Sequence, residues 1–142
     1  MAETEEAPRN DLPRFFHVRL RPASEQVVID DAVRERFRQI VEQIAARAEF
    51  EAVVLSASAN YVQLILGGLG DRDLETVVNL VKAETARGIL ADWPVYRFIL
   101  PGADFWDQGF IYTCHSAETI DAALQYIKLH GDVDLFGKPS SC

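Results

Sequence analysis

The sequence predicts an α+β fold of the ferredoxin-like type, in which an antiparallel sheet carries two helices on one face. Segments 14–21, 50–57 and 61–67 are typical of strands, because they alternate in polarity or are rich in Val, Leu and Ile. Segments 30–49 and 71–89 repeat their apolar residues at helical spacing. With a strand expected after the second helix, the core order is β-α-β-β-α-β, and 142 residues fit one compact domain.

The first half begins with a strand over Arg14–Arg21. Its alternation predicts one face formed by Phe16, Val18 and Leu20 and another formed by Phe15, His17, Arg19 and Arg21. Pro22 ends the strand, because proline has no N–H to donate to a sheet. Asp30 is a suitable N-cap for the next helix, which extends to about Glu49.

The strands at 50–57 and 61–67 are expected to form an antiparallel hairpin, after which Asp71 opens the second helix. Val95–Leu100 lies between two prolines and is expected to be a core strand. Phe110–Cys114 is expected to be an extra strand appended to the core. Ser116 is a good N-cap for a C-terminal helix, which Gly131 would end.

The charge balance restricts the partners. Fourteen Lys and Arg residues stand against 22 Asp and Glu residues, a formal net charge of -8, whereas nucleic-acid binders usually carry a basic surface. DNA binding would therefore need a local basic patch. Residues 1–13 are expected to form a disordered acidic leader, 14–131 the domain, and 132–142 a C-terminal tail. No apolar run approaches the length of a membrane span, so we expect a cytoplasmic protein without membrane contact.

Four segments, in this order, resemble the single-tyrosine HUH transposases, the insertion-sequence-two-hundred-like family and its relatives associated with repetitive palindromes. Residues 16–22 (FHVRLRP) are similar to the aromatic-His-apolar opening strand, and residues 60–66 (NYVQLIL) to the strand that carries the His-hydrophobic-His motif. Residues 105–110 (FWDQGF) are similar to the segment before the last strand. Residues 126–130 (YIKLH) resemble the helix that carries the nucleophilic tyrosine.

The resemblance implies a tyrosine that attacks a phosphodiester of single-stranded DNA, and a divalent ion that stabilises the developing charge. Tyr126 stands at the nucleophile position, so it is the candidate catalytic residue if activity is retained. The metal positions are degenerate, since Tyr61 and Gln63 replace the two histidines and His130 replaces the amide. A neutral phenol is a poor ligand for Mg²⁺. We therefore expect no cofactor, with Mg²⁺ or Mn²⁺ needed only if nicking is retained.

The resemblance thus implies a transposase-like protein that binds single-stranded or hairpin DNA and forms a homodimer. The degenerate metal positions predict that metal-dependent nicking and DNA transposition have been lost. The candidate DNA-binding residues are Arg19, Arg21, Lys82 and Arg87. Two alternatives stay open, a dimeric interaction module that binds no nucleic acid and an active single-tyrosine nuclease with an altered metal site. The plainer interpretation of Tyr61 and Tyr126 is that they are core-edge tyrosines with solvated hydroxyls, and that of the basic residues is a solvated surface.

Overall fold

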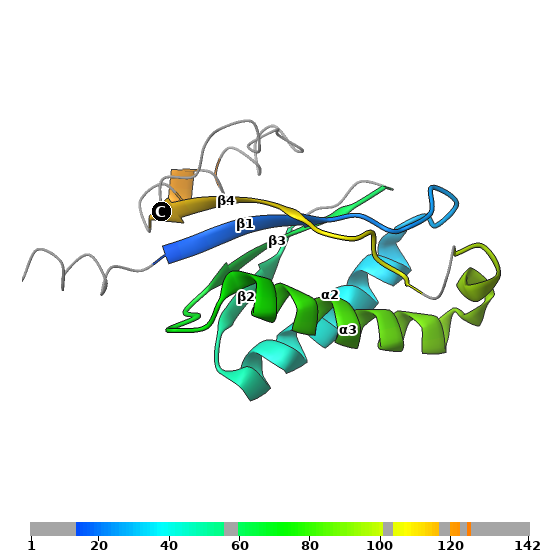
Figure 1. Cartoon of the computed structure of the whole chain (residues 1–142), viewed down its shortest axis with the longest axis horizontal. Coiled ribbons are helices and arrows are strands. Elements are labelled where there is room, and N and C mark those ends of the chain that lie inside the picture. Colours follow the sequence, from blue (N-terminus) through cyan, green and yellow to red (C-terminus); the bar gives the residue numbers. More distant parts are fainter. Residues whose placement is uncertain (1–13, 56–59, 101–103, 117–119, 123–124, 126–142) are drawn as a thin grey trace, which may run out of the picture.

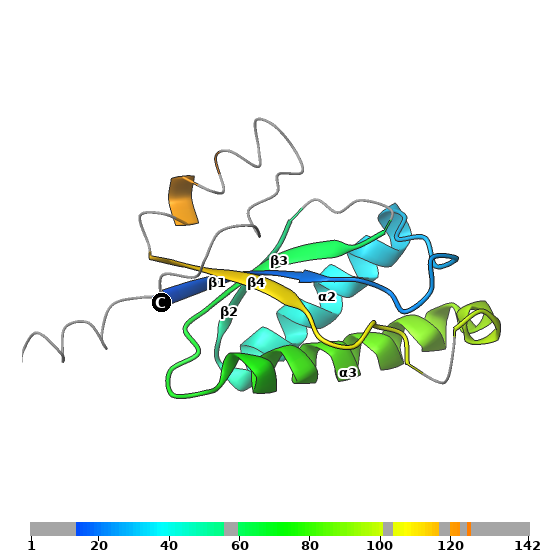
Figure 2. The same ribbon diagram turned by 45° about the horizontal axis from the view of Figure 1, so that its top comes forward.

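The computed structural model describes residues 14–55, 60–100, 104–116, 120–122 and 125. Within these residues, four strands form one antiparallel sheet in the order β2-β3-β1-β4. Figures 1 and 2 both show the two long helices, α2 and α3, on the same side of this sheet. The element sequence and the strand order are those of a ferredoxin-like fold, which confirms the predicted α+β class.

The strand β1 (Arg14–Leu20) lies in the middle of the sheet, between β3 (Val62–Gly67) and β4 (Ile111–Ser116). The short strand β2 (Glu51–Val54) pairs with the other side of β3, so the predicted hairpin is confirmed. Because side chains alternate along each strand, Val18 faces the helices together with its partner Leu64.

The helix α2 (Asp31–Ala48) begins where the sequence predicts, and the Val33 N–H donates to Oδ1 of its N-cap, Asp30, at 2.9 Å. The helix α3 (Leu74–Asp92) begins three residues after the predicted Asp71 and continues past Gly88. A Cβ at Gly88 would lie 2.5 Å from Cδ1 of Ile40, so glycine permits the close approach of the two helices. Their buried residues and those of the sheet form one core, which includes Val18, Leu20, Val33, Phe37, Ile44, Leu64, Leu66, Val78 and Ile89.

Arg72, just before α3, joins the end of α2 to the loop after β3. Its guanidinium donates to the carbonyls of Ala48, Glu49, Gly68 and Leu69, with the Glu49 contact at 2.9 Å. Glu49 has a φ of 63° in the left-handed region, which is unusual for a residue other than glycine. Arg72 therefore satisfies helix-terminal carbonyls that would otherwise need water or a glycine cap.

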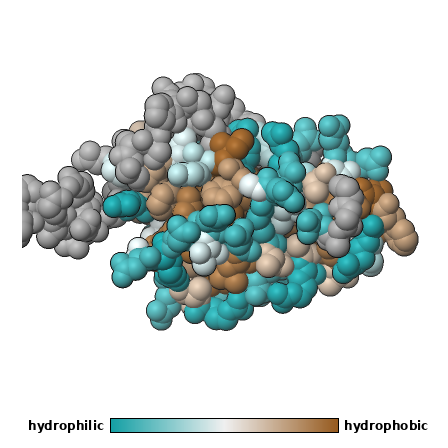
Figure 3. All heavy atoms as spheres, in the orientation of Figure 1, coloured by the Kyte–Doolittle hydropathy of each residue, from teal (hydrophilic) through white to brown (hydrophobic). Residues whose placement is uncertain are grey.

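The core strand predicted at Val95–Leu100 is wrong. This segment contains a 3₁₀ helix, η1 (Pro94–Phe98), which directly follows α3. Pro94 occupies the first turn, where its fixed φ favours a helical start, and Val95 and Phe98 are exposed by 61% and 86%. Figure 3 shows hydrophobic surface at the right-hand end of this view and also in the middle of the same face, with hydrophilic side chains between and around them.

The segment predicted as an extra strand, Phe110–Cys114, instead supplies the fourth core strand, β4. It pairs antiparallel with β1 and completes the ferredoxin-like sheet. Of the predicted C-terminal helix, the structure describes only residues 120–122 and 125, all helical. The leader and the tail lie outside the described residues, so their boundaries stay predictions. Within the described part of the chain, no helix is both long enough and apolar enough to cross a bilayer.

Candidate functional site

The face of the sheet opposite the helices carries polar side chains from three strands. His17 of β1 is paired in register with Thr113 of β4, and Arg19 of β1 with Gln63 of β3. Strand alternation therefore places these four residues on the same face. His17, Gln63 and Thr113 are exposed by 0%, 1% and 4%, so this polar cluster is buried rather than solvated.

His17 and Gln63 form a direct hydrogen bond, with 2.7 Å between Nε2 and Oε1. Because an amide oxygen only accepts, Nε2 of His17 carries the proton in this pair. Burial lowers the pKa of His17 to about 4, the hydrogen bond to Gln63 opposes the shift, and the charges of His115 and Arg19 add to it. His17 is therefore a neutral imidazole at pH 7.

Tyr61, at one of the two degenerate histidine positions, lies under the side chain of Arg19. The guanidinium carbon of Arg19 is 4.2 Å from the centre of the Tyr61 ring, within the range of a cation–π interaction. The hydroxyl of Tyr61 is buried, and no group in the described part of the chain hydrogen-bonds to it. The expectation that solvent satisfies this hydroxyl is therefore wrong.

These residues do not fit a divalent cation. The amide oxygen of Gln63 already accepts from His17, and the positive guanidinium of Arg19 covers Tyr61. Among the residues that the structure describes, no group of three or more His, Cys, Asp or Glu side chains could hold a metal ion. Two further site residues, Tyr126 and His130, lie outside the described residues, so their roles stay predictions.

The structure brings together two of the four predicted DNA-binding residues. Arg19 and Arg21 line one pocket of about 320 Å³ at the junction of β1 with the loop before β4. The other residues around this pocket are Asp107, Gln108, Gly109, Phe110 and Ile111.

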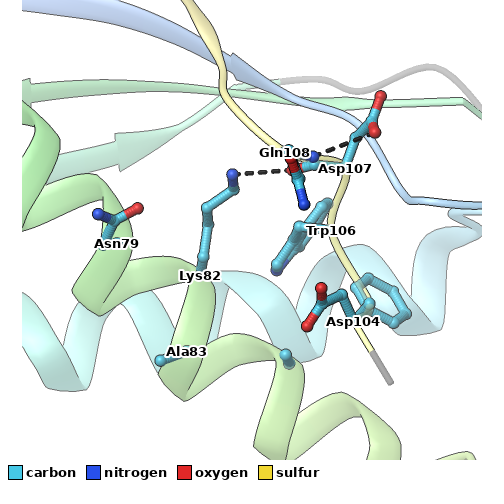
Figure 4. A pocket seen from close by; sticks show the side chains of 9 residues that line it. Asn79, Lys82, Ala83, Asp104, Trp106, Asp107 and Gln108 are labelled. Atoms are coloured by element: carbon cyan, nitrogen blue, oxygen red, sulfur yellow. Dashed lines mark hydrogen bonds between the residues drawn. The ribbon is translucent and has the colours of Figure 1, made fainter. Parts of the chain in front are cut away.

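Lys82 lies on the other side of the same loop, beside a second pocket of about 290 Å³ (Figure 4). Its ammonium donates to the carbonyls of Asp107 and Gly109, both at 2.8 Å. Burial lowers the pKa of Lys82, and the carboxylates of Asp107 and Asp104 partly offset that effect. The structure thus gives Lys82 a role in holding the loop, and its contact with DNA stays a prediction.

Arg87 lies one turn further along α3 and lines neither pocket. Its side chain is 70% exposed, and Nη1 is 3.5 Å from Oε1 of Glu84. Of the four basic residues that the sequence analysis grouped, Arg19 and Arg21 therefore share one pocket, Lys82 lies beside another, and Arg87 lines neither. A DNA contact by Arg87 also stays a prediction.

Sequence reasoning missed the contribution of β4 to the buried polar cluster. Oγ1 of Thr113 lies 3.0 Å from Nε2 of His115, and burial lowers the pKa of His115. The polar alternation of Thr113 and His115 along the strand was a usable signal. It could be assigned to this face only once the pairing with His17 was known.

Known proteins resemble this chain in sequence and in fold. The model of the family described as transposase IS200 like matches residues 15–130. A candidate transposase from Deinococcus radiodurans R1 aligns with a TM-score of 0.63 at 22% identity, over 84% of this chain and 92% of that one. A REP-associated tyrosine transposase bound to a REP hairpin aligns with a TM-score of 0.49 at 13% identity, over 85% and 70% of the two chains. A search of curated proteins finds no match.

The Deinococcus structure supports the fold alone, because a structural likeness at 22% identity carries no information on activity. The family match is stronger evidence, because it extends from β1 to the helix expected after Ser116 and includes all four segments of the sequence resemblance. This chain therefore belongs to the IS200-like transposase family.

Proposed function

We propose that this transposase-like protein binds single-stranded or hairpin DNA and has lost metal-dependent nicking and DNA transposition. The observation that carries the proposal is the stacking of Arg19 on Tyr61, at a position where the family resemblance implies a metal-ligating histidine. A guanidinium attracts phosphate and repels a divalent ion. The replacement of a metal-ligating histidine by a tyrosine that carries an arginine therefore supports retained DNA affinity together with lost catalysis.

DNA binding is tested by electrophoretic shift with labelled hairpin and single-stranded DNA across a salt series. We expect binding in EDTA that weakens steeply with salt, because phosphate contacts release counterions. Binding that needs Mg²⁺ or Mn²⁺ would contradict the metal-independent part of the proposal. Absence of binding to both DNAs would favour the interaction module.

Loss of nicking is tested at Tyr126, the residue that would form a covalent link to a cut DNA end. The protein is incubated with labelled hairpin DNA and Mn²⁺, and denaturing gels are examined for a shifted band. We expect no adduct from the natural chain. A denaturation-resistant band that disappears in Tyr126→Phe would show that the enzyme is active with an altered site.

The metal positions can be tested by rebuilding them. In the double variant Tyr61→His, Gln63→His, two imidazoles replace the phenol and the amide on one strand face. We expect Mn²⁺ to raise the melting temperature of this variant and to leave that of the natural chain unchanged, since a ligand stabilises only a fold that binds it. A saturable shift in the natural chain that Gln63→Ala abolishes would contradict the proposal.

We further propose a homodimer in the cytoplasm, where its DNA partner would be found. Among the described strands, β4 lies at an edge of the sheet, and its residues Ile111 and Tyr112 are exposed by 45% and 44%. Exposed strand edges favour pairing with another chain. Sedimentation that detects only monomers at high concentration would contradict the dimer.

A further inference from the structure

We infer that the pocket beside Arg19 and Arg21 is a metal-independent subsite for one phosphodiester of a DNA strand, and that Tyr61 is the positioning residue for Arg19. The inference rests on the proposed DNA binding and goes beyond it. It assigns a binding role to Tyr61, at a position that the resemblance associates with a metal. It also names the chemical group that this pocket recognises.

The stacking geometry gives Tyr61 this role. The ring centre lies 4.2 Å from the guanidinium carbon of Arg19, and Tyr61 as a whole is only 8% exposed. A buried aromatic ring is a fixed platform, so it restricts the many rotamers of a long arginine side chain. Stacking uses the planar face of a guanidinium, whereas phosphate is bound through the N–H groups at its edge. The two contacts are therefore compatible.

The charges around the pocket favour an anion. Among the described residues that line it, two are arginines and one, Asp107, is a carboxylate, whose Oδ1 accepts from the Gln108 N–H at 3.1 Å. The ammonium of Lys82 contacts the back of the same loop through the carbonyls of Asp107 and Gly109. A positive pocket on a chain with a net charge of -8 is a local exception to the overall field.

The size and the apolar lining favour a single-stranded nucleotide unit. The volume of about 320 Å³ lies near the lower end of the range for small-ligand pockets, roughly 300–1,000 Å³. Phe110 and Ile111 add apolar surface beside the arginines. Apolar and aromatic side chains contact sugars and unstacked bases, which a duplex keeps within its stack.

The test measures binding of a fluorescent ten-nucleotide oligothymidylate by anisotropy, in EDTA, at several salt concentrations. We expect Arg19→Gln to weaken binding about tenfold and to reduce the slope of log K against log salt by about 0.7, the value for one phosphate contact on a single strand. Tyr61→Leu removes the ring and is expected to weaken binding about threefold to fivefold. Tyr61→Phe keeps the ring and is expected to bind like the natural chain.

The matched control is Arg47→Gln, which removes the same charge from the helical layer. Arg47 pairs with Glu84 of α3 at 3.4 Å and is 61% exposed, so this variant is expected to change affinity less than twofold. Circular dichroism and melting temperatures establish that each variant is folded.

Three outcomes would overturn the inference. If the natural chain binds no DNA, the proposed function fails as well. If the natural chain binds but Arg19→Gln matches Arg47→Gln, the proposed function stands and only the subsite fails. If Tyr61→Phe loses as much affinity as Tyr61→Leu, the hydroxyl rather than the ring is required, and the platform role is wrong.

Discussion

The two faces of the sheet are buried in different ways. The face toward α2 and α3 is closed by aliphatic side chains such as Val18 and Leu64, which need only the right volume. The opposite face buries His17, Gln63 and Thr113, which need hydrogen-bond partners in defined positions. The first face supplies stability, and the second constrains which atoms can meet there. Changes on the first face should therefore act mainly on folding, and changes on the second on protonation and binding.

The largest effect is expected on the helical face. Leu64 is 1% exposed in the core, and Leu64→Ala should lower the free energy of unfolding by about 2–5 kcal/mol through lost burial and the cavity left behind. Urea denaturation measures this loss. A loss below 1 kcal/mol would show that the core relaxes around the site and that the two faces differ less than their packing indicates.

The second effect is a pH dependence that comes from the polar face. His17 has a pKa of about 4 in the folded chain and 6.5 as its ordinary value, so between these pH values the unfolded chain binds more protons. The contribution of His17 to the free energy of unfolding should therefore be fully present above pH 6.5. As the pH falls to 4, this contribution should decrease by about 3 kcal/mol. Denaturation at several pH values, compared between the natural chain and His17→Asn, isolates this contribution from that of the carboxylates.

His115 serves as the control for that measurement, because burial lowers its pKa as well. Its contribution has the same sign, and His115→Asn removes it separately. NMR titration of the two imidazoles assigns each transition. A pKa of His17 near 6.5 would contradict the burial of this side chain.

A third, smaller effect concerns the hydrogen bond between His17 and Gln63. Gln63→Leu leaves the buried Nε2–H of His17 without its acceptor, which should cost about 1–3 kcal/mol of stability. The same hydrogen bond raises the pKa of His17, so its removal should lower that pKa further. Urea denaturation and the NMR titration of His17 test the two parts independently. An unchanged pKa would mean that the two side chains do not interact in solution.

The smallest effect is expected at Tyr61, and it has the opposite sign. The hydroxyl is buried, and no described residue hydrogen-bonds to it, so Tyr61→Phe removes a desolvation cost and keeps the ring. We expect the free energy of unfolding to stay equal or to rise by up to about 1 kcal/mol. A clear loss of stability in thermal unfolding would reveal a hydrogen bond of this hydroxyl in solution.

The sequence predicted one face better than the other. The apolar period of α2 and the alternation of β1 were sufficient to predict these two elements, because burial of aliphatic side chains depends on local spacing. The strand predicted at Val95–Leu100 was wrong, since its β-branched and aromatic composition competes with the helical start at Pro94.

The polar cluster could be predicted only in part. Tyr61 and Gln63 were singled out because they replace histidines, yet their partners Arg19 and His17 come from another strand. That pairing depends on the register of β1 with β3, which a single sequence does not reveal. The same holds for Lys82, whose role depends on a loop that follows it by 25 residues.

The guanidinium of Arg72 contacts carbonyls from both halves of the fold. Ala48 and Glu49 belong to the first β-α-β unit, and Gly68 and Leu69 to the second. Neither unit can open locally without breaking contacts to the other, so the end of α2 and the start of α3 are expected to exchange their amide hydrogens with a common opening free energy. One side chain thereby makes the two halves a single cooperative unit. The pairing of β1 with β3, which brings the residues of the polar face together, is then expected to open only with that unit.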